Sequence, residues 1–121
     1  MARVNTFREL VAWQKAMELA KLVYRVTYKM PKEEQFGLTN QMRRAAVSIP
    51  SNIAEGFGRQ SRPDLIKFLR VARGSLNELT TQIQLALELD MLRDISHVTE
   101  LIAEVDRVLQ GLIRSLEKKR P

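Results

Sequence analysis

A long helical pattern between Ser61 and Leu89 constrains the fold more than any other feature of this sequence. Ser61 can cap the start of a helix, with Pro63 in its first turn and Asp64 returning the capping bond. Gly74, in the middle, lowers helix stability by about 1 kcal/mol relative to alanine, and a close approach of another backbone would account for it. Seven apolar residues follow at alternating steps of four and three, which places them on one helix face: Leu65, Leu69, Ala72, Leu76, Leu79, Ile83 and Ala86.

Two further segments repeat this spacing. The first runs from about Phe7 to Lys29 and opens with a capping box, T-x-x-E, that begins at Thr6. Its predicted seam is Leu10, Trp13, Met17, Ala20, Tyr24 and Thr27. The second follows Asp94, which can cap it. Its seam is Val98, Ile102, Val105, Leu109, Leu112 and Leu116. Each segment predicts a helix that buries one face.

A fourth helical segment begins near Leu38 and contains Pro50. Proline removes one backbone donor and clashes with the preceding turn, so we expect a kink there. Gly56 or Gly58 is expected to end the helix in the left-handed conformation. The predicted inner face is Leu38, Met42, Ala45, Ile49, Ile53 and Gly56.

These four segments fill a chain of 121 residues, which is the size of one domain. No segment shows the alternation typical of a strand, and the connections are short. We therefore predict an all-α fold, with residues 1–121 forming a single antiparallel up-down-up-down four-helix bundle whose second helix is kinked by proline.

The outer face of the proline-containing helix is unusual. Exposed helix faces are normally rich in Lys, Glu and Gln, whereas small residues occupy the middle of this face. Small side chains allow another helix to approach closely, so this face is a candidate subunit interface. A plain solvent-exposed face is the alternative. The candidate interface residues are Arg44, Ser48, Ser51, Ala54 and Glu55.

The charge of the chain favours a polyanionic partner. Its formal net charge is +6, and basic proteins attract RNA, DNA or acidic protein surfaces. Between Arg43 and Arg73 the basic residues outnumber the acidic ones by five. A solubilising face with salt bridges between subunits is the alternative to phosphate binding. The candidate nucleic-acid-binding residues are Arg43, Arg44, Arg59, Arg62, Lys67, Arg70 and Arg73.

Residues that carry catalysis or bind metals are sparse. The sequence has no cysteine, and its single histidine, His97, has no partner motif typical of a di-iron bundle. Phosphate-binding loop motifs are also missing. We expect no enzyme activity, no metal and no cofactor.

No apolar run approaches membrane-spanning length, so we expect a soluble, cytoplasmic protein. The sequence has no loop with interleaved aromatic residues, and Trp13 and Tyr24 fall on the predicted seam of the first segment, so we expect phosphate contact rather than base stacking.

Three stretches resemble a known family: FRELVAWQKAMELA, GLTNQMRRAAVSIPSNIAEGFGR and FLRVARGSLNEL. They are similar to the small proteins encoded in intervening sequences of bacterial 23S rRNA genes. The resemblance implies a four-helix bundle that assembles as a homopentamer. It also implies kinship with the accessory variability determinant protein of diversity-generating retroelements, a basic pentamer that binds nucleic acid and its reverse transcriptase. The implied partners are copies of the chain itself, RNA or DNA, and a reverse transcriptase. The alternative function is a protein-interaction scaffold whose arginines serve subunit or partner contacts.

Overall fold

The computed structural model describes residues 4–118, so the outermost residues of the predicted 1–121 domain lie outside it. Four α-helices follow one another with no strand among the described residues, which confirms the all-α prediction. Short 3-10 turns precede the first two helices. The elements are η1 (Phe7–Glu9), α1 (Val11–Thr27), η2 (Lys32–Glu34), α2 (Leu38–Gly58), α3 (Arg62–Glu88) and α4 (Ser96–Lys118).

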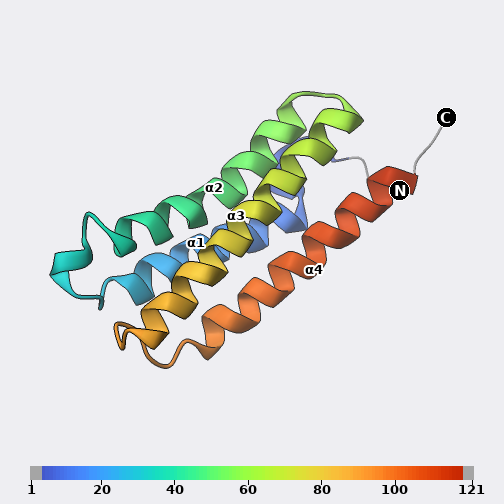
Figure 1. Cartoon of the computed structure of the whole chain (residues 1–121). Coiled ribbons are helices and arrows are strands. Elements are labelled where there is room, and N and C mark those ends of the chain that lie inside the picture. The colour runs from blue at the N-terminus through green and yellow to red at the C-terminus, as the bar shows by residue number, and fades with distance from the viewer. Residues whose placement is uncertain (1–3, 119–121) are drawn as a thin grey trace.

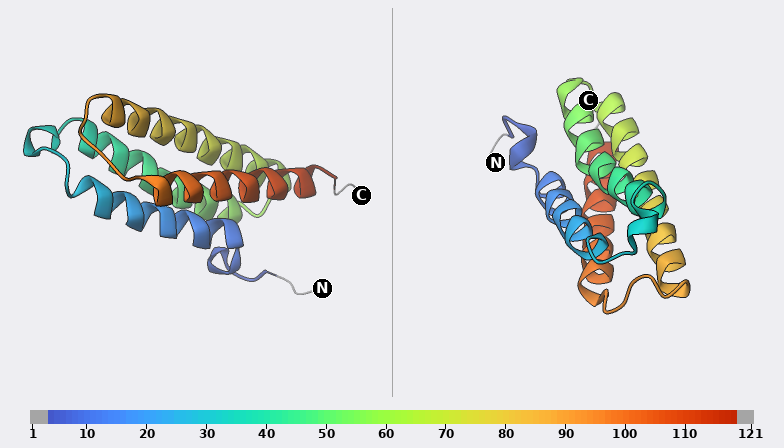
Figure 2. Two further views of the ribbon diagram at one scale, coloured as in Figure 1. Left: turned by 90° about the horizontal axis from the view of Figure 1, so that it is seen from below. Right: turned by 90° about the vertical axis from the view of Figure 1, so that its left-hand side faces the viewer.

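Consecutive helices run in opposite directions (Figure 1). Each helix packs against its neighbours in the chain, and α4 also packs against α1, so the four helices surround one core. The α1–α2 and α3–α4 connections lie at one end of the bundle, and the α2–α3 connection lies at the other (Figures 1 and 2).

The core is built from the predicted faces of α2, α3 and, in part, α4. All six inner-face residues of α2 are buried, as are six of the seven seam residues of α3, with Leu65 half-buried. On α4, Ile102, Leu112 and Leu116 are only partly buried. Spacing alone therefore identified most of the buried face of these helices.

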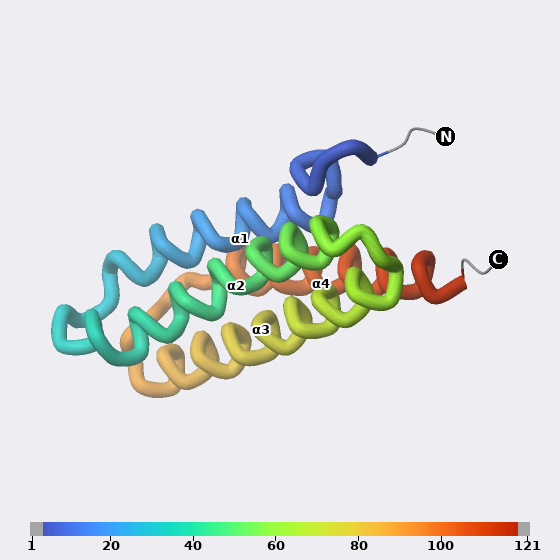
Figure 3. Tube along the Cα trace, turned by 90° about the horizontal axis from the view of Figure 1, so that it is seen from above, coloured from blue at the N-terminus to red at the C-terminus, as the bar shows by residue number. Residues whose placement is uncertain are grey.

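The first helix differs from the prediction in two respects. It does not run unbroken from Phe7, because Leu10 adopts an extended conformation and α1 begins at Val11. The capping box at Thr6 is present, but it caps the turn η1, which lies off the end of α1 (Figure 3). The buried face is also shifted relative to the predicted seam, because its small residues pack closest to the core. The buried residues of α1 are Ala12, Ala16, Leu19, Ala20, Val23 and Thr27.

The α2–α3 connection differs from the predicted glycine cap. No glycine among the described residues has a positive φ, and Gln60 adopts the left-handed conformation with φ 60°. Gly56 instead allows close packing, since a Cβ there would lie 2.7 Å from Phe68 Cβ. Ser61 caps α3 as predicted, accepting a hydrogen bond from the Asp64 backbone N–H at 3.2 Å. We expected another backbone to approach α3 closely at Gly74. Within the bundle the close approach of α2 and α3 occurs at Gly56 instead.

The second helix continues through Pro50 to Gly58. Pro50 is buried. Asn52 Nδ2 donates to the Ser48 carbonyl oxygen at 2.8 Å, which ties the turn around the proline to itself. The kink itself stays a prediction.

Candidate nucleic-acid interface and assembly groove

Arg43 packs against α1 at the side of the bundle. Its Nε donates to Thr27 Oγ1 at 2.9 Å, and its guanidinium lies 4.7 Å from the centre of the Tyr24 ring. Thr27 Oγ1 in turn donates to the Val23 carbonyl oxygen at 2.7 Å. This half-buried arginine joins α2 to α1. A phosphate would have to displace these contacts to bind Arg43, and nucleic-acid binding by this residue stays a prediction.

Three other predicted cations are paired with acids. Arg59 contacts Glu55 Oε2 at 3.0 Å and lies over the Phe68 ring. Arg73 Nε donates to Asp106 Oδ1 at 2.9 Å, and Arg70 pairs with Glu117. The last two pairs join α3 to α4. Acids on neighbouring turns and on α4 therefore neutralise these arginines, although Arg59 and Arg70 remain exposed, and their role in nucleic-acid binding stays a prediction.

The remaining three predicted cations are exposed. Arg44, Arg62 and Lys67 form no ion pair with any residue in the described range 4–118. Arg62 and Lys67 lie in the first turns of α3, next to a hollow of about 620 Å³ that Pro63, Ile66, Lys67, Arg70 and Val71 line. Arg44 is about 20 Å along α2 from the C-terminal end of that helix, where the chain turns into α3. The seven predicted residues thus do not form one continuous face.

The predicted subunit interface is divided between two sides of α2. Ser48 faces α3, where its Oγ lies 2.7 Å from Ser75 Oγ, and it also accepts a hydrogen bond from Asn52. Placing Ser48 on an outer contact face was wrong, because the closeness of α2 and α3 turns its hydroxyl inward. Ser51 and Ala54 point instead toward α1.

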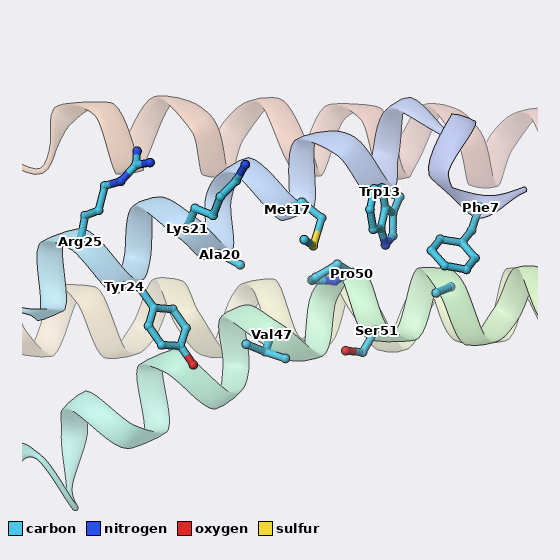
Figure 4. Close-up of a pocket in the computed structure, with 11 residues that line it drawn as sticks. Phe7, Trp13, Met17, Ala20, Lys21, Tyr24, Arg25, Val47, Pro50 and Ser51 are labelled. Atoms are coloured by element: carbon cyan, nitrogen blue, oxygen red, sulfur yellow. The ribbon is translucent and has the colours of Figure 1, made fainter.

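An apolar groove of about 610 Å³ lies between α1 and α2 (Figure 4). Val47, Pro50, Ser51 and Ala54 form its α2 wall. Phe7 closes one end and meets Trp13 edge-on, with ring centres 5.3 Å apart. We call this feature the assembly groove. From η1 and α1 it is lined by Phe7, Trp13, Met17, Ala20, Lys21, Tyr24 and Arg25.

The sequence is matched by one family model over residues 8–114, that of the 23S rRNA-intervening sequence protein. The chain belongs to this family. The match confirms the family resemblance that its RRAAVSIPSNIAEGFGR stretch carries. The kinship with the retroelement accessory protein stays an expectation. No protein with a curated description matches the chain.

A solved structure supports the fold of this family member. It is the crystal structure of a protein of unknown function from the S23 ribosomal protein family of Bacteroides thetaiotaomicron. The alignment covers 86% of this chain and 96% of that chain, with 24% sequence identity and a TM-score of 0.79. At this identity the similarity establishes the shared helical fold.

The described part of this family member shows neither a metal site nor a membrane segment. No three His, Asp or Glu side chains within residues 4–118 are grouped so that they could hold a metal ion. None of the helices in that range is both long and apolar enough to cross a membrane.

The groove and two exposed aromatic side chains were missed from the sequence. Trp13, Met17 and Tyr24 have helical spacing, so we assigned them to the core, yet they line the groove. Tyr28 and Phe36 are 86% and 88% exposed on the α1–α2 connection. Neither residue belongs to a predicted seam. Phe36 lies in the predicted connection, whereas Tyr28 lies inside the predicted first helix, which was expected to reach Lys29 but ends at Thr27.

Proposed function

We propose that this protein is a non-enzymatic module that assembles with copies of itself and binds RNA or DNA through the phosphate groups. The observation that carries the proposal is the pair of exposed cations, Arg62 and Lys67, at the start of α3. Neither side chain has an ion-pair partner within residues 4–118, so phosphate binding there breaks no existing salt bridge.

The surroundings of this pair favour an anion. The first turns of α3 present backbone N–H groups and the positive end of the helix dipole. The adjacent hollow on α3 offers apolar contact beside Lys67. A net charge of +6 adds long-range attraction for a polyanion. These features support contact with the nucleic-acid backbone, which is independent of base sequence.

Self-association supports the same function. A pair of cations on one copy makes few phosphate contacts, whereas an assembly repeats the pair and strengthens binding by avidity. The assembly groove offers an apolar surface on which another chain can pack. The family resemblance implies five copies, and we propose a pentamer on that basis.

A double charge reversal tests the proposal. We expect Arg62→Glu with Lys67→Glu to weaken RNA binding about tenfold or more and to reduce its salt dependence. Fluorescence anisotropy of a labelled RNA, measured between about 50 and 200 mM salt, gives the RNA affinity and its salt dependence. Lys29→Glu with Lys32→Glu is the matched control, since it makes the same charge change at the other end of the bundle. Undetectable binding by the wild type at low salt would contradict the proposal, as would equal binding by the Arg62 and Lys67 variant.

A protein-interaction scaffold is the second candidate. It is favoured by the finding that Arg43, Arg59, Arg70 and Arg73 already contact groups of their own chain. In that case a partner protein, such as the reverse transcriptase that the retroelement kinship implies, takes the place of nucleic acid. The scaffold predicts an assembled protein that does not bind RNA at low salt.

A further inference from the structure

We infer that the assembly groove of one copy receives the outer face of α3 from a second copy. The inference rests on the proposed self-association and names the two surfaces that meet. The occupying surface, which we call the α3 stripe, comprises Val71, Gly74, Glu78, Leu85 and Leu89.

The groove is suited to a helix. Its floor is apolar, and Tyr24 and Val47 on its edges remain 45% and 43% exposed. The residues of its α2 wall are small or compact, so a second backbone can come close. Large exposed apolar side chains along an open groove indicate a contact surface for another protein segment.

The α3 stripe has the shape of such a segment. Its members recur at steps of three, four, seven and four, which places them within about 60° on the helix surface. Val71, Leu85 and Leu89 are exposed on it. Among the described residues, α3 with its C-terminal cap carries three large exposed apolar side chains, as many as α1 with its own cap, and those of α3 lie on one side of the helix.

Gly74 is not explained by the packing of a single copy. A Cβ at this position would meet no atom within 4 Å, and the residue does not have a positive φ. Glycine is nevertheless the poorest helix former after proline. The missing side chain at Gly74 leaves a notch, which lets a second chain approach the α3 backbone closely. The α2 wall of the groove has small side chains at Ser51 and Ala54, so it can make this approach. Gly56, by contrast, is explained by Phe68 of its own chain.

The charges of the two surfaces are complementary. Lys21 and Arg25 line the groove, and no acid does. Glu78 lies in the middle of the stripe and Glu88 flanks it. Neither acid forms an ion pair with another residue of the described chain. Opposite charges across the contact favour this pairing and disfavour groove-to-groove contact.

The contact joins two different surfaces of the same chain. Each copy therefore offers a groove to one neighbour and a stripe to another. Such head-to-tail contacts generate a ring when the rotation closes. A two-fold dimer in which the same patch meets itself is not expected.

Two substitutions block one surface each. Gly74→Gln fills the notch of the stripe, and Ser51→Arg places a long cation in the groove wall. Both positions are exposed. At protein concentrations where the wild type is also monomeric, we expect the melting temperature of Gly74→Gln to equal or exceed that of the wild type. We expect each variant to sediment as a monomer of 14.0 kDa. Gly111→Gln is the matched control, because a Cβ there also meets open space, and it should assemble like the wild type.

Mixing the two blocked variants tests the head-to-tail arrangement. Gly74→Gln retains its groove and Ser51→Arg retains its stripe, so the mixture should form a one-to-one dimer that cannot extend. An assembled wild type together with an assembled Gly74→Gln variant would overturn the inference and leave self-association standing. A mixture that stays monomeric would also overturn it. A monomeric wild type would overturn both proposals.

Discussion

At the residue scale, the two adjacent arginines of α2 have different roles. Arg43 contacts Thr27 and the Tyr24 ring, whereas Arg44 is exposed. Their positions differ by 100° around the helix, which turns one toward α1 and the other toward solvent. Charge and composition alone do not reveal this difference, because the partners of Arg43 lie 16 and 19 residues away.

We expect Arg43→Ala to destabilise the protein by about 1–3 kcal/mol, since it removes a charge-assisted hydrogen bond and a cation–π contact. Arg44→Ala should change stability by no more than about 0.5 kcal/mol, as for other surface substitutions. Urea denaturation followed by circular dichroism measures both values. Equal losses from the two substitutions would show that the Arg43 contacts contribute little to stability.

At the element scale, the sequence predicted α2, α3 and their buried faces well. Heptad spacing, the Ser61 cap and the proline position are local signals, and the structure retains them. The break at Leu10 and the shifted face of α1 were not predictable in this way. They depend on η1 packing against α2 and on three alanines that let α1 approach the core. The groove arises from this shift, so local patterns did not predict it either.

Two glycines in helices are expected to respond oppositely to alanine. Gly56→Ala should destabilise the fold by about 1–3 kcal/mol, because its new Cβ would overlap Phe68 Cβ, 2.7 Å away. Gly74→Ala should stabilise the fold by up to about 1 kcal/mol, because it improves helix propensity in open space. Thermal unfolding at protein concentrations where both variants are monomeric separates these effects from assembly. A stabilising Gly56→Ala would contradict the packing of α2 on α3.

The proline in α2 is expected to matter for assembly more than for folding. Pro50 lines the groove, so a straighter helix in Pro50→Ala would displace Ser51 and Ala54. We expect unchanged helix content by circular dichroism and a weaker assembly by sedimentation velocity. An assembly as stable as that of the wild type would show that the groove does not depend on the predicted kink.

At the scale of the whole molecule, the sequence predicted a basic four-helix protein but not the organisation of its surface. Three of the seven predicted cations are neutralised by acids up to 47 positions away, as in the Arg70–Glu117 pair. Of the predicted interface, Ser51 and Ala54 lie in the groove and Ser48 does not. Within residues 4–118, the bundle thus carries an apolar groove on one side and, at the start of α3, cations that form no ion pair. Self-assembly would repeat both features around one particle.

Light scattering coupled to size-exclusion chromatography tests the central claim of self-assembly most directly. The chain has a mass of 14.0 kDa. At micromolar concentration we predict a single peak whose mass is an integral multiple of this value, with five copies as the expected number. A peak at 14.0 kDa over the whole accessible concentration range would contradict the account.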